Sequence, residues 1–260
     1  LFETFPESRG VFEEADEALG FSLSALCFEG PEDQLVLTAN TQPAILTTSV
    51  AAYRILEQRG VHPDWVAGHS LGEYSALVAA GALSLADAVR TVRRRGEYMQ
   101  EAVPVGEGAM AAILGLDLAK VEAVCREVAE GAVVSPANIN SPGQVVIAGN
   151  TAAVERAIGL AKEAGAKRAV ILPVSVPSHC ALMQPAAVKF AQHLEETEIV
   201  TPSIPVVQNV DAVMQDQPAM IRENLARQLD NPVLWVSSVQ AMHAHGIRRM
   251  IEAGPGKVLT

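Results

Sequence analysis

The pentapeptide Gly-His-Ser-Leu-Gly at positions 68–72 is the feature that most restricts how this chain can fold. A short apolar run, Trp65–Ala67, precedes it, and an apolar stretch with helical character, Leu71–Ala80, follows it. The pattern G-x-S-x-G between a strand and a helix is typical of a nucleophile elbow, a turn too sharp for side chains beside the serine. The sequence therefore predicts an α/β protein with Ser70 raised at this turn. The start of the helix would direct the Leu71 N–H toward a developing oxyanion.

Composition supports a globular protein and excludes several classes of function. Of the 260 residues, 49% are apolar and 19% are charged, so the chain can bury a substantial core. The net charge of −11 argues against nucleic acid as a general partner, because phosphate binding needs a concentrated basic surface. No apolar run approaches the roughly 18 residues of a membrane span. The three cysteines (Cys27, Cys125 and Cys180) form no CxxC motif, which favours reduced thiols and a cytoplasmic location.

The middle of the chain has a pattern of its own. Strand-like and helical runs follow one another at 110–113 (strand), 117–129 (helix), 133–137 and 144–148 (strands), 151–164 (helix) and 168–172 (strand). This order of elements is that of a ferredoxin-like fold. We therefore predict a hydrolase-like α/β core with a parallel sheet and helices, formed by residues 1–103 and 174–260. Residues 104–173 would form an inserted ferredoxin-like α+β subdomain.

The pattern of the larger part predicts both helices and strands. Helices are expected at 5–19, 42–59, 71–80, 84–101, 178–195, 220–229 and 235–245. Strands are expected at 65–67, 205–207 and 249–251. Pro43 stands at the start of the second of these helices, a position that proline favours.

A serine nucleophile needs a base, and the chain offers six histidines: His62, His69, His179, His193, His243 and His245. His179 ends the segment Val-Pro-Ser-His, where a strand passes into a helix, and loops at strand ends often present catalytic groups. His69 is expected to point away from the serine and pack in the core. The other four lie in a loop or among polar helical residues, with spacing unsuited to a shared metal site.

A hydrolase triad would also place a carboxylate between the serine and the histidine in the chain. Asp87 and Asp117 are the only aspartates there, and both are typical of residues at a helix start. The glutamates of this region mostly lie on amphipathic helix faces. The sequence therefore predicts a Ser70–His179 dyad whose imidazole is oriented by a group other than a carboxylate, unlike an ordinary esterase.

A set of motifs along the chain resembles those of a known family. The chain resembles the malonyl-CoA:acyl-carrier-protein transacylases of bacterial-type fatty acid synthesis, and the acyltransferase domains of polyketide and fatty acid synthases. The similar segments span nearly the whole chain, in the family's order: 41–45, 67–76, 95–96, 99–104, 138–149, 173–179, 227–229, 231–232 and 254–257.

The resemblance implies a role for each matching residue. Ser70 would be the nucleophile that becomes malonylated, and His179 its general base and then acid. The Gln228 backbone carbonyl would orient His179, and Arg95 would grip the free carboxylate of the malonyl group. A planar guanidinium suits that task because it pairs with a carboxylate through two hydrogen bonds, which selects malonyl over acetyl. The alternative for Arg95 is a charge on a solvated helix face.

The implied partners are malonyl-CoA and acyl carrier protein, with coenzyme A thioester as substrate and no metal or redox cofactor. A monomer is expected. Carrier proteins of this type are acidic, so docking needs a local basic patch, with Lys162, Lys167 and Arg168 or Arg248 and Arg249 as candidates. The family also places a strand and a Gly-Gln-Gly-Ser-Gln loop ahead of the residue that is Leu1 here, and continues beyond 254–257. We therefore expect the chain to be trimmed at both ends.

Other functions share parts of this pattern. A serine esterase or thioesterase of the α/β type has the elbow but no need for Arg95. A polyketide-type acyltransferase would use another extender unit, and a methyl-branched donor differs from malonyl by one small group. A docking module without activity would keep the fold alone. The Gly-Pro-Gly-Lys segment at 254–257 lacks the full spacing of a phosphate loop.

Overall fold

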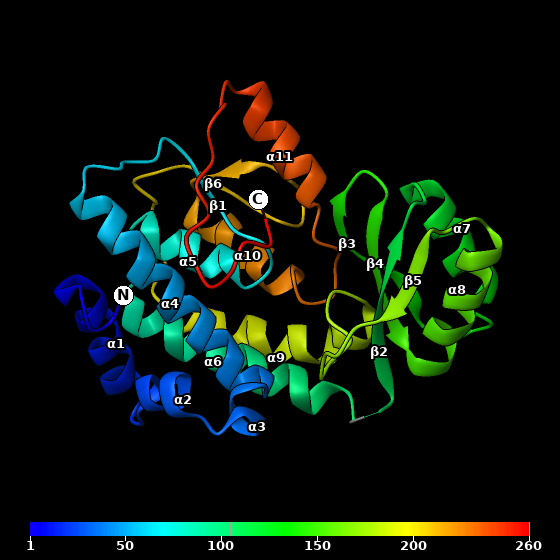
Figure 1. Cartoon of the computed structure of the whole chain (residues 1–260), viewed down its shortest axis with the longest axis horizontal. Coiled ribbons are helices and arrows are strands. Elements are labelled where there is room, and N and C mark those ends of the chain that lie inside the picture. Colours follow the sequence, from blue (N-terminus) through cyan, green and yellow to red (C-terminus); the bar gives the residue numbers. More distant parts are fainter. Residues whose placement is uncertain (105, 260) are drawn as a thin grey trace.

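The computed structural model describes residues 1–104 and 106–259, and two parts are visible in it (Figure 1). The predicted boundaries at 103/104 and 173/174 lie in the described part, whereas Val105 and Thr260 fall outside it. The larger part contains the helices α1 (Pro6–Leu19), α2 (Leu23–Glu29), α3 (Glu32–Leu35), α4 (Thr38–Gln58), α5 (Gly72–Ala79), α6 (Leu85–Ala102), α9 (Gln184–Glu195), α10 (Pro218–Arg227) and α11 (Trp235–Ala244). A short 3₁₀ helix, η1 (Ala181–Met183), precedes α9. None of the described helices combines the length and apolar character that crossing a bilayer requires.

The sheet of the larger part is small and mixed. Strand β1 (Val66–Ala67) pairs in parallel with β6 (Val206–Val207), and β7 (Met214–Gln215) lies antiparallel to β6. The prediction of a parallel sheet is therefore correct only for the first pair, because residues 208–213 form a turn that brings β7 back along β6. The strand predicted at 249–251 is absent from the described sheets, and this segment is largely exposed.

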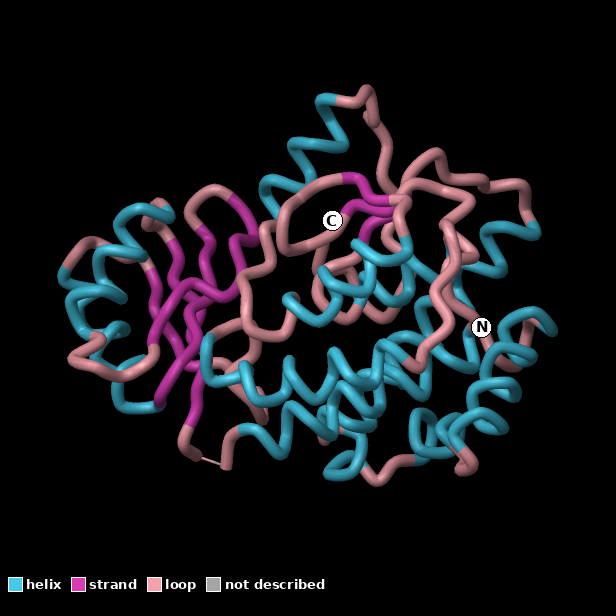
Figure 2. Tube along the Cα trace, turned by 180° about the vertical axis from the view of Figure 1, so that it is seen from behind, coloured by secondary structure: helices cyan, strands magenta, loops and turns pink. Residues whose placement is uncertain are grey.

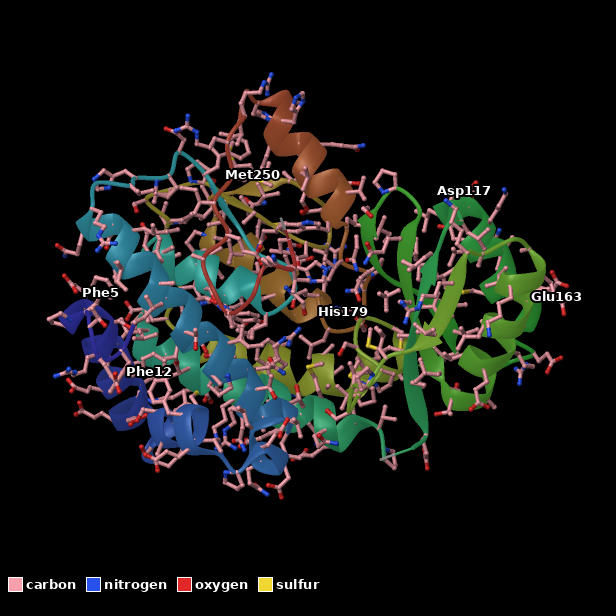
Figure 3. The ribbon with its side chains drawn as sticks, viewed as in Figure 1. Phe5, Phe12, Asp117, Glu163, His179 and Met250 are labelled. Atoms are coloured by element: carbon pink, nitrogen blue, oxygen red, sulfur yellow. The ribbon has the colours of Figure 1, made fainter. Side chains whose placement is uncertain are left out.

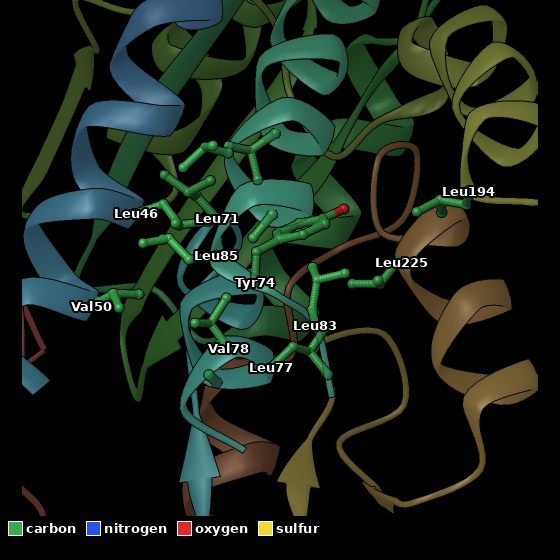
Figure 4. Close-up of a cluster of buried hydrophobic side chains, with 14 of the residues drawn as sticks. Leu46, Val50, Leu71, Tyr74, Leu77, Val78, Leu83, Leu85, Leu194 and Leu225 are labelled. Carbon is green, nitrogen blue, oxygen red and sulfur yellow. The ribbon is translucent and has the colours of Figure 1, made fainter. Parts of the chain in front are cut away.

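An apolar cluster centred on α5 holds the larger part together. Tyr74 and Leu77 are fully buried there, and side chains of α4 and α6 surround them (Figure 4). Helix α4 begins at Thr38, one turn before its predicted start near Pro43. Helix α6 crosses this first turn so closely that a Cβ at Gly96 would lie 2.6 Å from the Ala39 Cα. This close packing stabilises a helical turn that the sequence alone did not indicate.

The smaller part is built from a four-stranded antiparallel sheet and two helices. Its elements are β2 (Gly108–Leu114), α7 (Leu118–Val128), β3 (Val134–Ser141), β4 (Gln144–Asn150), α8 (Thr151–Glu163) and β5 (Arg168–Ile171), with the strands in the order β3-β4-β2-β5. Along β2, Ala111 and Ile113 pack with α7 and α8, whereas Met110 packs with Cys180 of the larger part. The alternation places the sheet between its helices and the larger part (Figure 2).

A backbone connection joins the two parts at β3. The Ile139 N–H donates to the Val233 carbonyl at 2.9 Å, and the Val233 N–H donates to the Ala137 carbonyl at 2.9 Å. Val233 thus forms a parallel bridge beside Asn138 at the edge of the small sheet. The small sheet is therefore hydrogen-bonded to the segment that connects α10 to α11.

Candidate active site

Ser70 lies in a sharp turn between β1 and α5. Its φ of 51° is in the left-handed region, which non-glycine residues rarely adopt. A Cβ on Gly68 would overlap the backbone of Gly72, so the turn requires glycine at position 68. The Ser70 N–H donates to Asn209 Oδ1 at 2.6 Å. The following N–H, that of Leu71, has no acceptor among the described residues and stands at the start of α5.

The imidazole of His179 contacts Ser70 through one nitrogen and a backbone carbonyl through the other. The distance from His179 Nε2 to Ser70 Oγ is 2.8 Å. The distance from His179 Nδ1 to the carbonyl oxygen of Gln228 is 2.7 Å. Because a carbonyl can only accept, Nδ1 carries the proton and Nε2 is free to accept the hydroxyl proton of Ser70. The His179 backbone is also in the left-handed region, and its N–H donates to the Leu229 carbonyl at 2.9 Å.

The surroundings of His179 keep its imidazole neutral. The residue is 3% exposed and lies where the two parts of the molecule meet (Figure 3). Burial, and after it the positive charge of Arg95, lower the pKa of His179 to about 3. The imidazole is therefore in its basic form at neutral pH, as general base catalysis requires.

Arg95 places a buried cation beside the serine. Its Nη1 donates to Gln42 Oε1 at 2.7 Å, and its Nη2 donates to Gln228 Oε1 at 2.8 Å and lies 3.3 Å from Ser70 Oγ. The guanidinium lies over the Tyr74 ring, 5.7 Å from its centre. Burial lowers the Arg95 pKa, yet arginine stays protonated at physiological pH.

Arg95 is not a solvated charge on a helix face, because it is only 2% exposed. No carboxylate of the described residues lies within 4 Å of its guanidinium. A buried cation is usually paired with an anion. The guanidinium is thus able to bind an anionic group brought by a ligand.

His69 is turned toward the smaller part. Its Nε2 donates to Asn140 Oδ1 of β3 at 2.8 Å, and its ring centre lies 5.7 Å from that of Trp235. The expectation that His69 only packs in the core is therefore incomplete, since the residue links the elbow to the small sheet. Burial lowers the pKa of His69.

Several polar residues of the site were not predicted. The side chains of Gln42, Glu73 and Asn209 all hydrogen-bond to Ser70, Arg95 or Gln228, and Gln228 also uses its side chain there. One signal was available for Glu73, the single charged residue in the apolar stretch 71–80. Nothing in the local pattern marks Asn209, because its contacts come from the folding of distant segments.

An elbow serine beside a neutral histidine is the arrangement of enzymes that form a serine-linked acyl intermediate. Over residues 1–260 the sequence matches the family described as the acyl transferase domain. The chain belongs to the acyl transferase family.

Among its relatives, this chain is similar to the malonyl CoA-acyl carrier protein transacylase of Escherichia coli strain K12. The two are 57% identical over 258 residues, which are 99% of this chain and 84% of the relative. The enzyme of the same name from Bacillus subtilis strain 168 is 52% identical, over 100% of this chain and 82% of the relative.

Solved structures of malonyl transferases are also similar to this chain over nearly its whole length. An acyl carrier protein S-malonyltransferase from Vibrio cholerae matches with a TM-score of 0.96 and 53% identity, over 99% of this chain and 84% of that chain. A malonyl-transacylase solved in complex with a type II PKS acyl-carrier protein matches with a TM-score of 0.97 and 52% identity, over 99% of this chain and 84% of that chain.

Proposed function

We propose that this protein transfers the malonyl group of malonyl-CoA to the phosphopantetheine thiol of acyl carrier protein, in fatty acid biosynthesis. The observation that carries the proposal is the buried Arg95 guanidinium, 3.3 Å from Ser70 Oγ. A nucleophile next to a fixed cation favours an acyl donor that ends in a carboxylate. The similar proteins are named for malonyl transfer and for acyl carrier protein, which supports the same donor and acceptor.

The first half of the reaction would acylate the serine. As Ser70 Oγ attacks the thioester carbon, His179 Nε2 takes the hydroxyl proton. The Leu71 N–H, at the start of α5, stabilises the negative charge that develops on the carbonyl oxygen. The C–S bond then breaks, the coenzyme A thiolate leaves with the proton from His179, and a malonyl ester of Ser70 remains.

The second half would run in the reverse sense. The phosphopantetheine thiol of the carrier protein gives its proton to His179 and attacks the ester carbonyl. The bond from the acyl carbon to Ser70 Oγ breaks, and Oγ recovers the proton from His179. The Gln228 carbonyl supports both halves, because it holds the imidazole in the tautomer that leaves Nε2 free.

The architecture suits such a reaction. We infer that residues 1–103 and 174–260 are a hydrolase-like core, supported by the strand, elbow and helix at Ser70. Residues 104–173 would be a ferredoxin-like insert. The antiparallel strand order β3-β4-β2-β5 supports this, with α7 connecting β2 to β3 and α8 connecting β4 to β5. His179 would then present the base to a substrate bound between the two units.

The proposal is tested by incubating the protein with malonyl-CoA or with acetyl-CoA and measuring intact mass. We expect a malonyl adduct on the wild type and none on Ser70→Ala. Arg95→Ala should reduce malonyl labelling by about 10²-fold or more, because a charge-assisted bidentate pair is lost. Acetyl labelling should be weak in the wild type and less affected by Arg95→Ala.

The same measurement separates the competing functions. Equal labelling by acetyl and malonyl would contradict the role of Arg95 and favour an esterase or a general acyltransferase. Faster labelling by methylmalonyl-CoA would favour another extender unit. A wild type that forms no adduct with any donor would favour a docking module.

A further inference from the structure

Glu73 is a buried carboxylate three residues beyond Ser70. It is 1% exposed and is the only charged residue of α5. No nitrogen of a described lysine, arginine or histidine lies within 4 Å of its carboxylate. Burial raises the pKa of Glu73 to about 7, against the effect of its hydrogen bonds. An ionisable group in this place reduces stability unless its partners compensate, which points to a role beyond packing.

Three N–H donors from distant segments converge on this carboxylate. Gln208 Nε2 donates to Oε1 at 2.8 Å, and the Asn209 N–H donates to Oε2 at 3.1 Å. Gln228 Nε2 donates to Oε2 at 2.8 Å. Glu73 therefore joins the helix after the elbow to the loop after β6 and to the end of α10.

The contact with Gln228 fixes the direction of an amide. Gln228 Nε2 donates to Glu73 and, at 3.0 Å, to the Ser70 carbonyl, while its Oε1 accepts from Arg95 Nη2 at 2.8 Å. If the amide turned over, its oxygen would face a carboxylate and its NH₂ would face a guanidinium. Above about pH 7, where Glu73 is ionised, the carboxylate thus keeps the amide oxygen directed at Arg95.

The contact with Asn209 supports the elbow itself. Asn209 Oδ1 accepts from the Ser70 N–H at 2.6 Å, and Asn209 Nδ2 donates to the Gly68 carbonyl at 2.7 Å. Ser70 has a positive φ, and a strained residue persists only where its surroundings hold it. Glu73 fixes the backbone of Asn209, the residue that holds Ser70 in this conformation.

We propose that Glu73 is a positioning residue for acyl transfer, acting through the Gln228 amide to hold Arg95 in place for the donor's carboxylate. This inference rests on the proposed function and deepens it. The chain of contacts runs from Glu73 to Gln228 Nε2, continues from Oε1 of the same amide to Arg95 Nη2, and ends 3.3 Å from Ser70 Oγ. A donor without a carboxylate does not use this chain.

The test compares two donors in single-turnover labelling of Ser70, read by intact mass over a series of donor concentrations. For Glu73→Gln we expect the half-saturating concentration of malonyl-CoA to rise about tenfold, the size of one lost hydrogen bond to a charged group. The maximal rate should change by less than about threefold for either donor, because the contact through Asn209 and the elbow affects both alike. The half-saturating concentration of acetyl-CoA should change by less than about twofold. The matched control is Glu127→Gln, an exposed residue of α7, which should behave as the wild type.

A double-mutant cycle tests the route through Gln228. Gln228→Met keeps the length of the side chain and the backbone carbonyl that holds His179, but removes the amide. It should show at least as large a loss for malonyl-CoA, because it also removes the direct bond to Arg95, and adding Glu73→Gln to it should cause no further loss specific to malonyl-CoA. Should Glu73→Gln fail to fold, as judged by circular dichroism, Glu73→Asp takes its place in the cycle.

Each result has a distinct meaning. Equal losses for malonyl-CoA and acetyl-CoA would show that Glu73 only supports the fold, and losses that add in the double variant would show a route other than Gln228. Either result overturns the inference while the wild type still forms a malonyl adduct. A wild type without that adduct would instead remove the proposed function, and the inference with it.

Discussion

At the scale of single residues, the burial of His179 determines how acylation responds to acid. With a pKa lowered to about 3, the imidazole stays basic where an ordinary histidine becomes charged. We predict that the maximal rate of Ser70 malonylation, at saturating donor, varies by less than about twofold between roughly pH 8 and pH 5. An imidazole of ordinary pKa would lose about thirtyfold over this range.

Rapid-quench intact-mass measurements across this range test the prediction, with circular dichroism at each pH as the control for folding. An inflection near pH 6.5 that persists in Glu73→Gln would show that His179 titrates normally, because this variant removes the titration of Glu73, whose pKa is about 7. His179→Gln should lower the rate by about 10²–10⁴-fold at every pH, because the general base is removed.

At the scale of elements, the turn between β1 and α5 depends on the absence of a side chain at Gly68. Because a Cβ there would overlap the Gly72 backbone, Gly68→Ala should displace the start of α5. We predict a loss of more than about 2 kcal/mol in the free energy of unfolding, and no malonyl adduct. Chemical denaturation and intact mass measure the two effects.

Gly159 provides the matched control for this change. It lies inside α8, and a Cβ there would meet nothing within 4 Å. Gly159→Ala should leave labelling unchanged and raise the free energy of unfolding by about 0.5–1 kcal/mol, the gain from replacing glycine in a helix. A larger loss from Gly159→Ala than from Gly68→Ala would contradict this account of the elbow.

The elements that could be predicted from the sequence are those with a long periodic pattern or a clear end signal. Helix α1 ends at Gly20 in the left-handed conformation, and Asp117 caps α7 by accepting from the Lys120 N–H, both as the residue types indicate. The two-residue strand β7 and the short helices α2 and α3 were missed, because they are too short to show a period.

Part of the site could be predicted in the same way. The elbow pattern indicated Ser70, and the position of His179 between a strand and a helix indicated the base. The family motifs indicated Arg95 and the Gln228 carbonyl, and all four groups lie together in the structure. The polar residues beneath them are contributed by segments more than 130 residues apart, as the contact between Glu73 and Asn209 shows. Local patterns do not report which distant amides meet a carboxylate in the folded chain.

At the scale of the whole molecule, the net charge of −11 leaves few places for an acidic carrier protein to dock. Two exposed basic patches are candidates: an insert patch of Lys162, Lys167 and Arg168, and a C-terminal patch of Arg248 and Arg249. Arg248 also donates to the His243 carbonyl at the end of α11, so Arg249 is the better residue to change there.

We predict that charge reversal in one patch slows malonyl transfer from Ser70 to the carrier protein by about tenfold at low salt, and less at high salt. Labelling of Ser70 by malonyl-CoA should stay unchanged. Arg249→Glu and the pair Lys167→Glu and Arg168→Glu serve as controls for each other in stopped-flow transfer assays. Equal, salt-independent rates in both variants would place docking elsewhere.

The bridge between β3 and Val233 has a consequence for the exchange of subdomains between related enzymes. Gln228, whose carbonyl holds His179, stands five residues before Val233, whose backbone completes the edge of the small sheet. A chimaera cut only at 104 and 173 would join a foreign β3 to a native Val233. A change in the position of Val233 at this bridge would shift residues 228–233, and with them the Gln228 carbonyl that holds the His179 imidazole. Grafts that carry residues 228–233 together with the insert should therefore preserve activity better than grafts of the insert alone.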